Sequence, residues 1–297
     1  NLPLTITGSS NLKSIIYTEK KGSAQCKSAV IFGAMRSGNT TIIKAKKSRN
    51  HTELLCKYLK LPLKVKRYKN FDEIRVSKVN LIKPINYNIP SDISSSAFFI
   101  VLTALSKKSK LKIKNVNVNS SRTGIIKILK LMGIKIIFRN LRKYKGEKIA
   151  DLFIKSTNTI KSINCPVELN SAAIDEFLLI FLVASKCKGV SIFRDLKELN
   201  KKESKRLDWG LKILNLIGIK TKKISNHGIK IHGKPELDLY KKYEIKGYLK
   251  DHRVFMTSII AALTLGGNWK IHDANSYKTS FPNFLKILKN LGAKINE

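Results

Sequence analysis

A pattern of apolar and polar positions recurs along the chain in segments that are close copies of one another. Each copy has Leu or Ile at a spacing of three or four residues, which is typical of the last turns of an amphipathic helix. A glycine then ends the helix in the three clearest copies, and alternating residues that predict a strand follow it. These helix ends lie about 70 to 85 residues apart, so the pattern predicts a structural repeat. The copies are Lys127–Ile136 (KILKLMGIKI), Lys212–Thr221 (KILNLIGIKT) and Lys286–Ile295 (KILKNLGAKI), with a weaker one at Leu55–Val65 (LCKYLKLPLKV).

An earlier helix, followed by a strand, precedes each of these copies. The repeat therefore reads helix, strand, helix, strand, with further strands after it, and its helices are expected to pack inward beneath a shared sheet surface. This arrangement is a mixed α/β (α+β) fold. Four repeats fit the chain, at about 22–88, 92–165, 173–247 and 251–297. The earlier helices are expected at Ala24–Ala34, Ser94–Leu105, Ile174–Ala184 and Val254–Leu265, and the strands after them at Thr40–Ile43, Leu111–Ile113, Val190–Phe193 and Trp269–His272.

Polar residues gather where the expected helices begin. Helix N-termini present unpaired N–H groups and the positive end of the helix dipole, so they are suited to binding anions. A single Ser, Thr or Asp at such a position is also an ordinary helix cap. The earlier helices begin at 22–25, 91–94, 173–176 and 251–253, and the later ones at 48–52, 120–123, 202–206 and 279–282.

Arginines at three of these helix starts are harder to explain as caps. Arg49, Arg206 and Arg253 stand where the helix dipole disfavours a cation. Paired recognition of phosphate or carboxylate would compensate for that unfavourable position. The chain is therefore expected to gather a small, multiply anionic metabolite onto the N-termini of its repeated helices.

The net charge of +38 suggests a nucleic-acid partner, but the distribution of the charge argues against one. Only ten of the 58 basic residues are arginines, and the lysines are spread along the whole chain. Aromatic residues do not alternate with them in the way that RNA-binding sheets require. A basic surface still attracts small phosphorylated substrates, so we expect small anions and no nucleic acid as partners.

Cysteines and apolar runs bear on the compartment. The cysteines form no CxxC pair and no cluster with His, so a zinc site is not expected, and their scatter suits a reducing compartment. The best apolar runs, Phe177–Ala184 and Phe255–Leu265, are far shorter than the ~20 residues that span a bilayer. We expect a cytoplasmic protein without a membrane partner. The cysteines are Cys26, Cys56, Cys165 and Cys187.

Motifs at these helix starts together resemble the 5-enolpyruvylshikimate-3-phosphate synthase family. The resemblance covers essentially all 297 residues, and it is specific in the combination of motifs rather than in any one of them. It implies the two-domain enolpyruvyl transferase fold, in which each domain is built from three βαβαββ repeats. The matching motifs are Ser23-Ala24-Gln25, Asp175, the run Lys202-Glu203-Ser204-Lys205-Arg206, Asp251-His252-Arg253 and Ser280-Phe281-Pro282.

The resemblance also sets the expected domain organisation. Four repeats would be the last four of six, so we expect the chain to be the C-terminal two-thirds of the enzyme. Residues 1–88 would be the remainder of the N-terminal domain, and residues 89–297 would form the C-terminal domain of three repeats. Ser23 and Gln25 would then belong to a different domain from Asp175, with substrate bound between the two.

The family transfers the enolpyruvyl group of phosphoenolpyruvate to the 5-hydroxyl of shikimate 3-phosphate and releases phosphate. The resemblance implies that Asp175 is the base toward that hydroxyl and Glu203 the proton donor to the methylene carbon. It implies no cofactor and no metal, and a monomer that acts on small molecules. The implied shikimate 3-phosphate residues are Ser23, Ala24, Gln25, Ser48, Asp175 and Lys202, the implied phosphoenolpyruvate residues are Gln25, Arg206 and Arg253, and Arg49 and Glu198 are further candidates.

The sequence departs from the family pattern at three positions. Ala24 stands where many members have a second serine, and this Ser-Ala-Gln form matches the glyphosate-tolerant branch. Lys205 replaces the usual aspartate of its run, which puts the salt bridges around Arg206 in doubt. Thr279 stands where some members carry an active-site lysine.

Two other functions stay open. The related UDP-N-acetylglucosamine enolpyruvyl transferases share the fold, although Ser23-Ala24-Gln25 with Lys202-Glu203 and Arg206 argues against them. A non-catalytic basic binding module would instead gather its lysines and arginines on one outward face, away from the helix starts. If the chain is the enzyme, Asp175, Lys202, Glu203, Arg206 and Arg253 should converge on one cleft.

Overall fold

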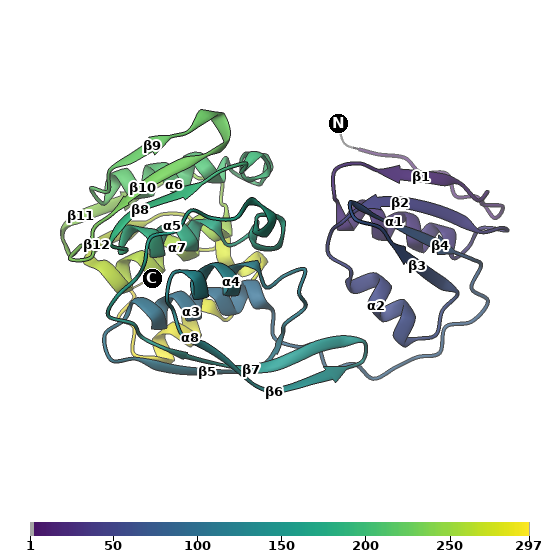
Figure 1. The fold of residues 1–297 in the computed structure, drawn as a ribbon, viewed down its shortest axis with the longest axis horizontal. Coiled ribbons are helices and arrows are strands. Elements are labelled where there is room, and N and C mark those ends of the chain that lie inside the picture. The colour runs from purple at the N-terminus through teal and green to yellow at the C-terminus, as the bar shows by residue number, and fades with distance from the viewer. Residues whose placement is uncertain (1–2, 297) are drawn as a thin grey trace. The chain divides into compact units, whose positions relative to one another are not determined.

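The computed structural model describes residues 3–296 and confirms a mixed α/β fold (Figure 1). The chain divides into two compact units. Unit 1 comprises the residues up to Ile89 together with Lys143–Lys148, and unit 2 comprises Pro90–Arg142 and the residues from Ile149 onward. Each unit has its own hydrophobic core.

Unit 1 contains one complete βαβαββ repeat. Its sheet has the order β1-β2-β4-β3, with β1 parallel to β2 and the other pairs antiparallel. Alternate residues of the strands, such as Ile43, Ala45 and Ile74, are buried against Ile31 of the first helix. The leading strand was not predicted from the sequence. The elements are β1 (Ile16–Glu19), α1 (Ala24–Ala34), β2 (Thr41–Lys46), α2 (His51–Tyr58), β3 (Leu63–Arg67) and β4 (Phe71–Val76).

Unit 2 contains the other repeats, each with its own small sheet. The sheet orders are β5-β7-β6, β8-β10-β9 and β11-β12. The elements are α3 (Ile93–Leu105), β5 (Lys110–Asn117), α4 (Gly124–Leu131), β6 (Ile136–Tyr144) and β7 (Glu147–Lys155), then α5 (Phe177–Ser185), β8 (Gly189–Phe193), α6 (Arg206–Leu216), β9 (Thr221–Lys223) and β10 (Ile229–Gly233), then β11 (Leu239–Ile245), α7 (His252–Leu265), β12 (Gly266–Ile271) and α8 (Phe284–Asn290).

The leading strand is short in the first two repeats of unit 2, which is why the sequence pattern did not show it there. It is reduced to the isolated parallel bridge Ser91↔Val116 in the first of them and to the bridges Lys161↔Lys188 and Asn164↔Ile192 in the second. In the last repeat it is β11, which pairs in parallel with β12. The predicted boundary at 247 was therefore wrong, because β11 belongs with the helix and strand that follow it.

Helices α3, α5 and α7 pack against one another inside unit 2, and the sheets lie outside them (Figure 1). All residues of α5, from Phe177 to Ser185, are buried. A helix that is apolar on every side must be surrounded by protein, and this one is. The predicted inward packing of the earlier helices is confirmed, and their N-termini are consequently fixed by the core.

The predicted glycine helix ends are confirmed, whereas the strand predicted after Gly292 and the helix start predicted at Ile174 were wrong. Gly133, Gly218 and Gly292 have φ of 91°, 76° and 94°, a conformation that glycine adopts without strain. Residues 293–296 form no strand, because β11 and β12 pair only with each other among the described residues. Helix α5 begins at Phe177 rather than Ile174, since a 3₁₀ turn over Ser171–Ala173 comes first.

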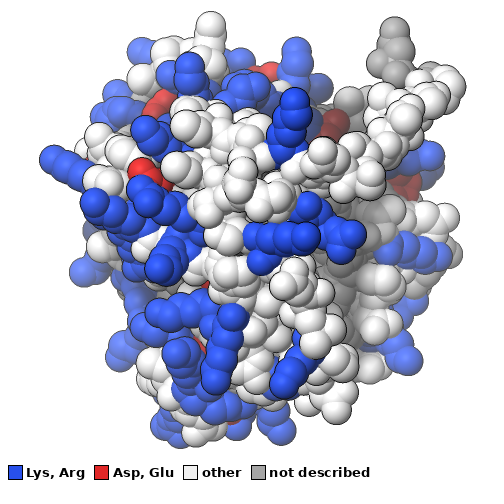
Figure 2. Space-filling model, turned by 90° about the vertical axis from the view of Figure 1, so that its right-hand side faces the viewer, with Lys and Arg blue, Asp and Glu red and all other residues white. Residues whose placement is uncertain are grey.

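The excess of basic residues is mostly on the surface. Figure 2 shows Lys and Arg spread over the viewed face, with few Asp or Glu side chains between them. Two basic side chains are exceptions, because Lys27 and Arg206 are 2% and 1% exposed. Within residues 3–296, no helix is both long and apolar enough to cross a membrane.

Candidate functional site

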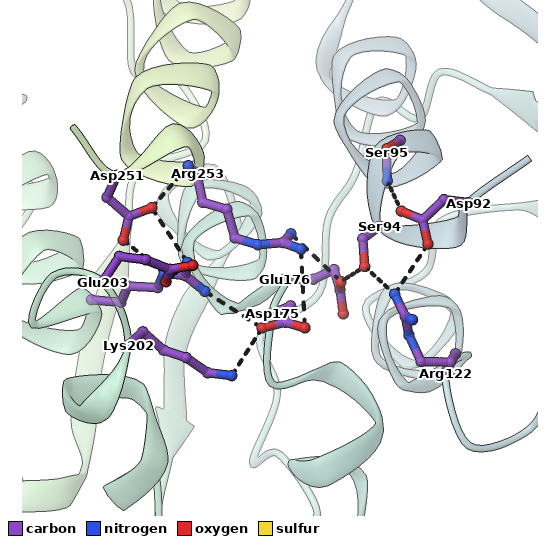
Figure 3. Close-up of polar contacts among 11 residues, drawn as sticks. Asp92, Ser94, Ser95, Arg122, Asp175, Glu176, Lys202, Glu203, Asp251 and Arg253 are labelled. Atoms are coloured by element: carbon purple, nitrogen blue, oxygen red, sulfur yellow. Dashed lines mark hydrogen bonds and ion pairs between the residues drawn. The ribbon is translucent and has the colours of Figure 1, made fainter. Parts of the chain in front are cut away.

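Asp175 lies at the centre of a group of charged side chains in unit 2 (Figure 3). It follows the 3₁₀ turn before α5, so its carboxylate stands at the start of a fully buried helix. Lys202 Nζ is 3.2 Å from Asp175 Oδ1, Arg206 Nη1 is 3.4 Å from the same oxygen, and Arg253 Nη2 is 4.0 Å from Oδ2. The structure thus brings together residues that are far apart in the sequence.

Arg206 is fixed from behind by Asp251, the N-cap residue of α7. Its Nε donates to Asp251 Oδ2 at 2.9 Å, and both side chains are buried. Asp251 also accepts from Ser204 Oγ at 2.8 Å and caps α7 by accepting from the Arg253 backbone N–H at 2.9 Å. One buried carboxylate therefore positions both arginines, one through its side chain and the other through its helix turn.

Glu203 completes the group at its solvent side. Arg206 Nη2 donates to Glu203 Oε2, and the Glu203 side chain is 53% exposed. The five residues Asp175, Lys202, Glu203, Arg206 and Arg253 therefore form one connected set of ion pairs, so their predicted convergence is confirmed. The set contains two carboxylates, groups that can transfer protons, and three cations that can hold anionic groups.

Sequence reasoning missed a second group of polar residues beside this one (Figure 3). Glu176 Oε1 lies 3.8 Å from Arg253 Nη1 and accepts a hydrogen bond from Ser94 Oγ. Arg122 Nη2 in turn donates to Ser94 Oγ at 2.6 Å and to Asp92 Oδ1 at 3.1 Å. Each of these residues was interpreted as part of a helix start, and only their three-dimensional contacts show that they form a network.

The two buried carboxyls have opposite pKa shifts. Burial raises the pKa of Glu176, and the nearby Arg253 only partly offsets that effect. Burial alone would also raise the pKa of Asp251, but hydrogen bonding to Arg206 and the charge of that residue bring it below its ordinary value. Burial and Arg253 lower the pKa of His252, which favours its neutral ring.

The predicted shikimate phosphate residues of the first repeat lie in unit 1. Ser23 is the N-cap of α1 and accepts from the Cys26 backbone N–H at 3.2 Å. Ala24 and Gln25 form the first turn of the helix, and the Gln25 side chain is exposed. Ser48 Oγ is buried and has no hydrogen-bond partner among the described residues. Arg49 lies two residues before α2.

A buried ion pair supports this part of unit 1. Lys27 Nζ is 2.6 Å from Glu53 Oε1, so the pair joins α1 to α2. The same ammonium donates to the Arg49 backbone oxygen at 2.8 Å. Lys27 thus fixes the backbone that carries Ser48 and Arg49, although it lies too deep to reach solvent.

The backbone that carries Asp175 and Glu176 is held by a close contact with Gly124. A Cβ atom at position 124 would lie 2.6 Å from the carbonyl carbon of Ala172 and 2.7 Å from the nitrogen of Ala173. Only glycine fits here without displacing the 3₁₀ turn that precedes Asp175. The first residue of α4 therefore helps to define the position of the carboxylates in the next repeat.

Three residues raised by the sequence analysis lie outside these contacts. Glu198 pairs with Lys201 at 2.8 Å, and both side chains are well exposed. Lys205 is exposed at the N-cap of α6, and the salt bridges of Arg206 form without an aspartate at that position. Thr279 donates to the Ser276 backbone oxygen at 3.0 Å. Within residues 3–296, no group of three His, Cys, Asp or Glu side chains could hold a metal ion.

Comparison with known proteins gives a consistent set of relatives. The family model for EPSP synthase (3-phosphoshikimate 1-carboxyvinyltransferase) matches residues 1–288. The 3-phosphoshikimate 1-carboxyvinyltransferase of Ruthia magnifica subsp. Calyptogena magnifica is 37% identical over 300 residues, which cover 99% of this chain and 66% of that protein. The protein of the same name from Thermodesulfovibrio yellowstonii is 35% identical over 291 residues, which cover 97% and 65%.

Solved structures are similar over the same span. An EPSP synthase from Acinetobacter baumannii matches with a TM-score of 0.87 at 32% identity, covering 96% of this chain and 64% of that chain. The enolpyruvyl transferase NikO from Streptomyces tendae matches with a TM-score of 0.73 at 12% identity, which shows a shared fold alone. The chain spans about two thirds of the length of the curated relatives it matches.

Proposed function

Because the chain belongs to the EPSP synthase family, we propose that it takes part in transferring the enolpyruvyl group of phosphoenolpyruvate to the 5-hydroxyl of shikimate 3-phosphate, with release of phosphate. The observation that carries this proposal is the connected set of Asp175, Lys202, Glu203, Arg206 and Arg253 in unit 2. The curated relatives that are 33–37% identical carry the name of this activity, which favours it over the UDP-N-acetylglucosamine reaction.

The reaction needs one proton delivered to carbon and one removed from oxygen. Glu203, the more exposed carboxyl, donates its proton to the methylene carbon of phosphoenolpyruvate. Asp175 accepts the proton of the 5-hydroxyl as that oxygen bonds to the enol carbon. Loss of phosphate from the resulting adduct, together with a proton from the new methyl group, restores the double bond. Two carboxylates that pair with the same guanidinium, that of Arg206, are suited to these steps.

The cations of the site hold the two anionic substrates that would otherwise repel each other. Arg206 and Arg253 bind the phosphate and carboxylate of phosphoenolpyruvate, because a guanidinium donates two parallel hydrogen bonds to either group. Lys202 contacts shikimate 3-phosphate, together with Asp175. In unit 1, Ser23, Ala24, Gln25 and Ser48 line the shikimate phosphate site, and Gln25 also serves phosphoenolpyruvate. Fixing both substrates in this way lowers the entropic barrier to reaction.

We further propose that the protein acts as a cytoplasmic monomer on small molecules, without a nucleic-acid or membrane partner. The support for the compartment is the state of its cysteines. Cys56, Cys165 and Cys187 are buried free thiols and Cys26 is an exposed one, which suits a reducing compartment.

A phosphate-release assay tests the proposed function. The protein, purified in the full form in which its cells make it, should release phosphate only when phosphoenolpyruvate and shikimate 3-phosphate are both present. Asp175→Asn should lower kcat about 10²–10⁴-fold, the usual effect of losing an acid–base group. Asp195→Asn is the matched control, because Asp195 is exposed and forms a solvent-exposed ion pair with Lys197 at 3.7 Å. Turnover with UDP-N-acetylglucosamine in place of shikimate 3-phosphate would contradict the proposal.

A further inference from the structure

Arg253 lies between two consecutive carboxylates. Its Nη2 is 4.0 Å from Asp175 Oδ2 and its Nη1 is 3.8 Å from Glu176 Oε1. Both separations are longer than a hydrogen bond, so charge attraction rather than a directional bond holds the guanidinium here. The arginine is 14% exposed at its side chain, whereas Glu176 is 2% exposed. Asp175 faces the site, and Glu176 faces the protein interior.

Glu176 is itself held by residues of another repeat (Figure 3). Ser94, on the first turn of α3, donates its hydroxyl hydrogen to Glu176 Oε1. Arg122 donates from the same nitrogen, Nη2, to Ser94 and Asp92, and Asp92 caps α3 by accepting from the Ser95 N–H at 2.8 Å. The Glu176 carboxylate therefore cannot turn away from Arg253 without breaking its hydrogen bond with Ser94, whose hydroxyl is itself held by Arg122.

A buried carboxylate needs a compensating charge. Burial raises the pKa of Glu176, while Arg253 and the Ser94 hydroxyl act in the opposite direction, and Asp175 raises it further. Charge–charge attraction is mutual, so the ionised carboxylate stabilises Arg253 in place as Arg253 stabilises the carboxylate. Loss of either charge should leave the other less well fixed.

We propose that Glu176 is a positioning residue for the anion site: its carboxylate, fixed by Ser94 and Arg122, holds the Arg253 guanidinium beside Asp175 so that it can bind the phosphate or carboxylate of a substrate. This inference rests on the proposed function, because it assigns to Arg253 the role of binding phosphoenolpyruvate. The two carboxylates at the start of α5 would then have different roles. Asp175 meets substrate, and Glu176 sets the position of one cation that does.

The central test is a double-mutant cycle between Glu176 and Arg253 in the full protein. Glu176→Gln keeps the size of the side chain and can still accept from Ser94, but it removes the charge. We expect the KM for phosphoenolpyruvate to rise about tenfold, the effect of losing one charged contact, with the KM for shikimate 3-phosphate changed less than twofold. In an Arg253→Gln background, the same change should add less than a factor of two, since Glu176 acts through Arg253.

A matched pair of hydroxyl deletions on α3 separates positioning from general support of the fold. Ser94→Ala removes the hydrogen bond to Glu176, and we expect a threefold rise or more in the KM for phosphoenolpyruvate. Thr103→Val removes a buried hydroxyl of the same helix that donates only to the Phe99 backbone oxygen, and no change in KM is expected. A conservative Glu176→Asp change, which keeps the charge, should recover part of the loss seen with glutamine.

The outcomes tell a failure of this inference apart from a failure of the proposed function. Turnover of phosphoenolpyruvate and shikimate 3-phosphate by the wild type decides the function alone. If the wild type shows no turnover, the same cycle is followed by the Kd for phosphoenolpyruvate or inorganic phosphate in calorimetry. Equal effects of Glu176→Gln on both substrates, or full additivity with Arg253→Gln, would overturn the positioning role. Absence of both turnover and anion binding would overturn both proposals.

Discussion

Each unit of the molecule has a buried ion pair next to its candidate site residues: Lys27 with Glu53 in unit 1, and Arg206 with Asp251 in unit 2. The two pairs differ in what else the cation contacts. In unit 1, Lys27 and Glu53 are both nearly inaccessible, and beyond Glu53 the ammonium contacts the Arg49 backbone oxygen. In unit 2, Arg206 pairs with the buried Asp251 and at the same time reaches Asp175 and Glu203. In unit 1 the buried cation gives support alone, whereas in unit 2 Arg206 combines support with contacts to Asp175 and Glu203, the two carboxylates proposed to act on substrate.

The chemistry of the two cations explains this difference. An ammonium is a single point charge, so Lys27 gives its contacts to one carboxylate and one backbone oxygen. A guanidinium is a rigid fork with donors on three nitrogens, so Arg206 can be anchored through Nε and still present Nη1 and Nη2 to the site. We therefore expect mutations in the unit 2 pair to lower stability and activity together. In the unit 1 pair, the effect on stability should be separable from the effect on activity.

The largest effect is expected from Asp251→Asn. The change leaves Arg206 buried without its main counter-charge, which typically costs about 3–5 kcal/mol in the free energy of unfolding. Turnover should fall about 10²-fold or more, because Arg206 loses its anchor and moves relative to substrate. Thermal or urea unfolding and the phosphate-release assay would measure the two effects, with Asp195→Asn as the exposed control. A variant that kept its stability but lost activity would break the comparison.

The pair in unit 1 gives the next largest effect. Lys27→Met leaves the Glu53 carboxylate buried and unpaired, and should destabilise unit 1 by about 3–5 kcal/mol. The double change Lys27→Met with Glu53→Leu should restore most of that stability, because a buried ion pair is often replaced by apolar residues at little cost. Limited proteolysis and urea unfolding of the variants would show it.

The double variants, in which each ion pair is replaced by apolar residues, then separate the effect on stability from the effect on activity. With the Lys27–Glu53 pair replaced, the Arg49 backbone still lacks its hydrogen bond, so the KM for shikimate 3-phosphate should stay raised by several-fold while kcat recovers. With Arg206→Met and Asp251→Leu together, stability should recover but turnover should not. Recovery of turnover in this second case would show that Arg206 does not contact substrate.

The pH dependence of stability should differ in sign between Asp251 and Glu176. The pKa of Asp251 is lower in the folded protein than its ordinary value of 3.8, so its contribution is present above that pH and is lost as the pH falls through the folded pKa. The pKa of Glu176 is raised above its ordinary value of 4.5, so stability falls as the pH rises from 4.5 through the folded pKa. Urea unfolding between pH 3 and 8 should measure this. The stability of Glu176→Gln relative to the wild type should increase as the pH rises, and that of Asp251→Asn should increase only as the pH falls into the acid range.

The smallest effect is expected from Glu198, which the sequence offered as a candidate site residue. Its pair with Lys201 is solvent-exposed, and such pairs contribute about 0–1 kcal/mol. Glu198→Gln should change the free energy of unfolding by less than about 0.5 kcal/mol and leave both KM values within twofold. A selective rise in the KM for either substrate would place Glu198 in the site after all.

The sequence predicted the repeats and the main charged set because both follow short, strong rules. Helix periodicity and the glycines at 133, 218 and 292 marked the helix ends, and the arginines at helix starts marked Arg206 and Arg253 as unusual. Three of the leading strands were missed because β1 has four residues and those of the first two repeats of unit 2 are isolated bridges, too short for an alternating pattern. The seven-residue β11 was instead assigned to the repeat before it. The strand expected after Gly292 does not form, because no neighbouring strand pairs with it among the described residues.

The network around Glu176 could not be predicted, because its bonds cross between repeats. Ser94 and Asp92 are ordinary residues for a helix start, and nothing local links them to Arg122 or Glu176. One signal was present: Glu176 directly precedes the fully apolar run of α5, where an acidic side chain has no access to water. An acid in that position requires a partner, which the sequence alone cannot name.

The contact at Gly124 limits how the repeats of unit 2 can diverge. A single methyl group at this position of one repeat would press on the Ala172–Ala173 backbone of the next, and so on the carboxylates that follow it. Mutational drift in the two repeats is therefore coupled at this point: the glycine can be lost only if the facing turn changes at the same time. A residue with no side chain, and with no chemical role of its own, should for that reason be among the least replaceable in the protein.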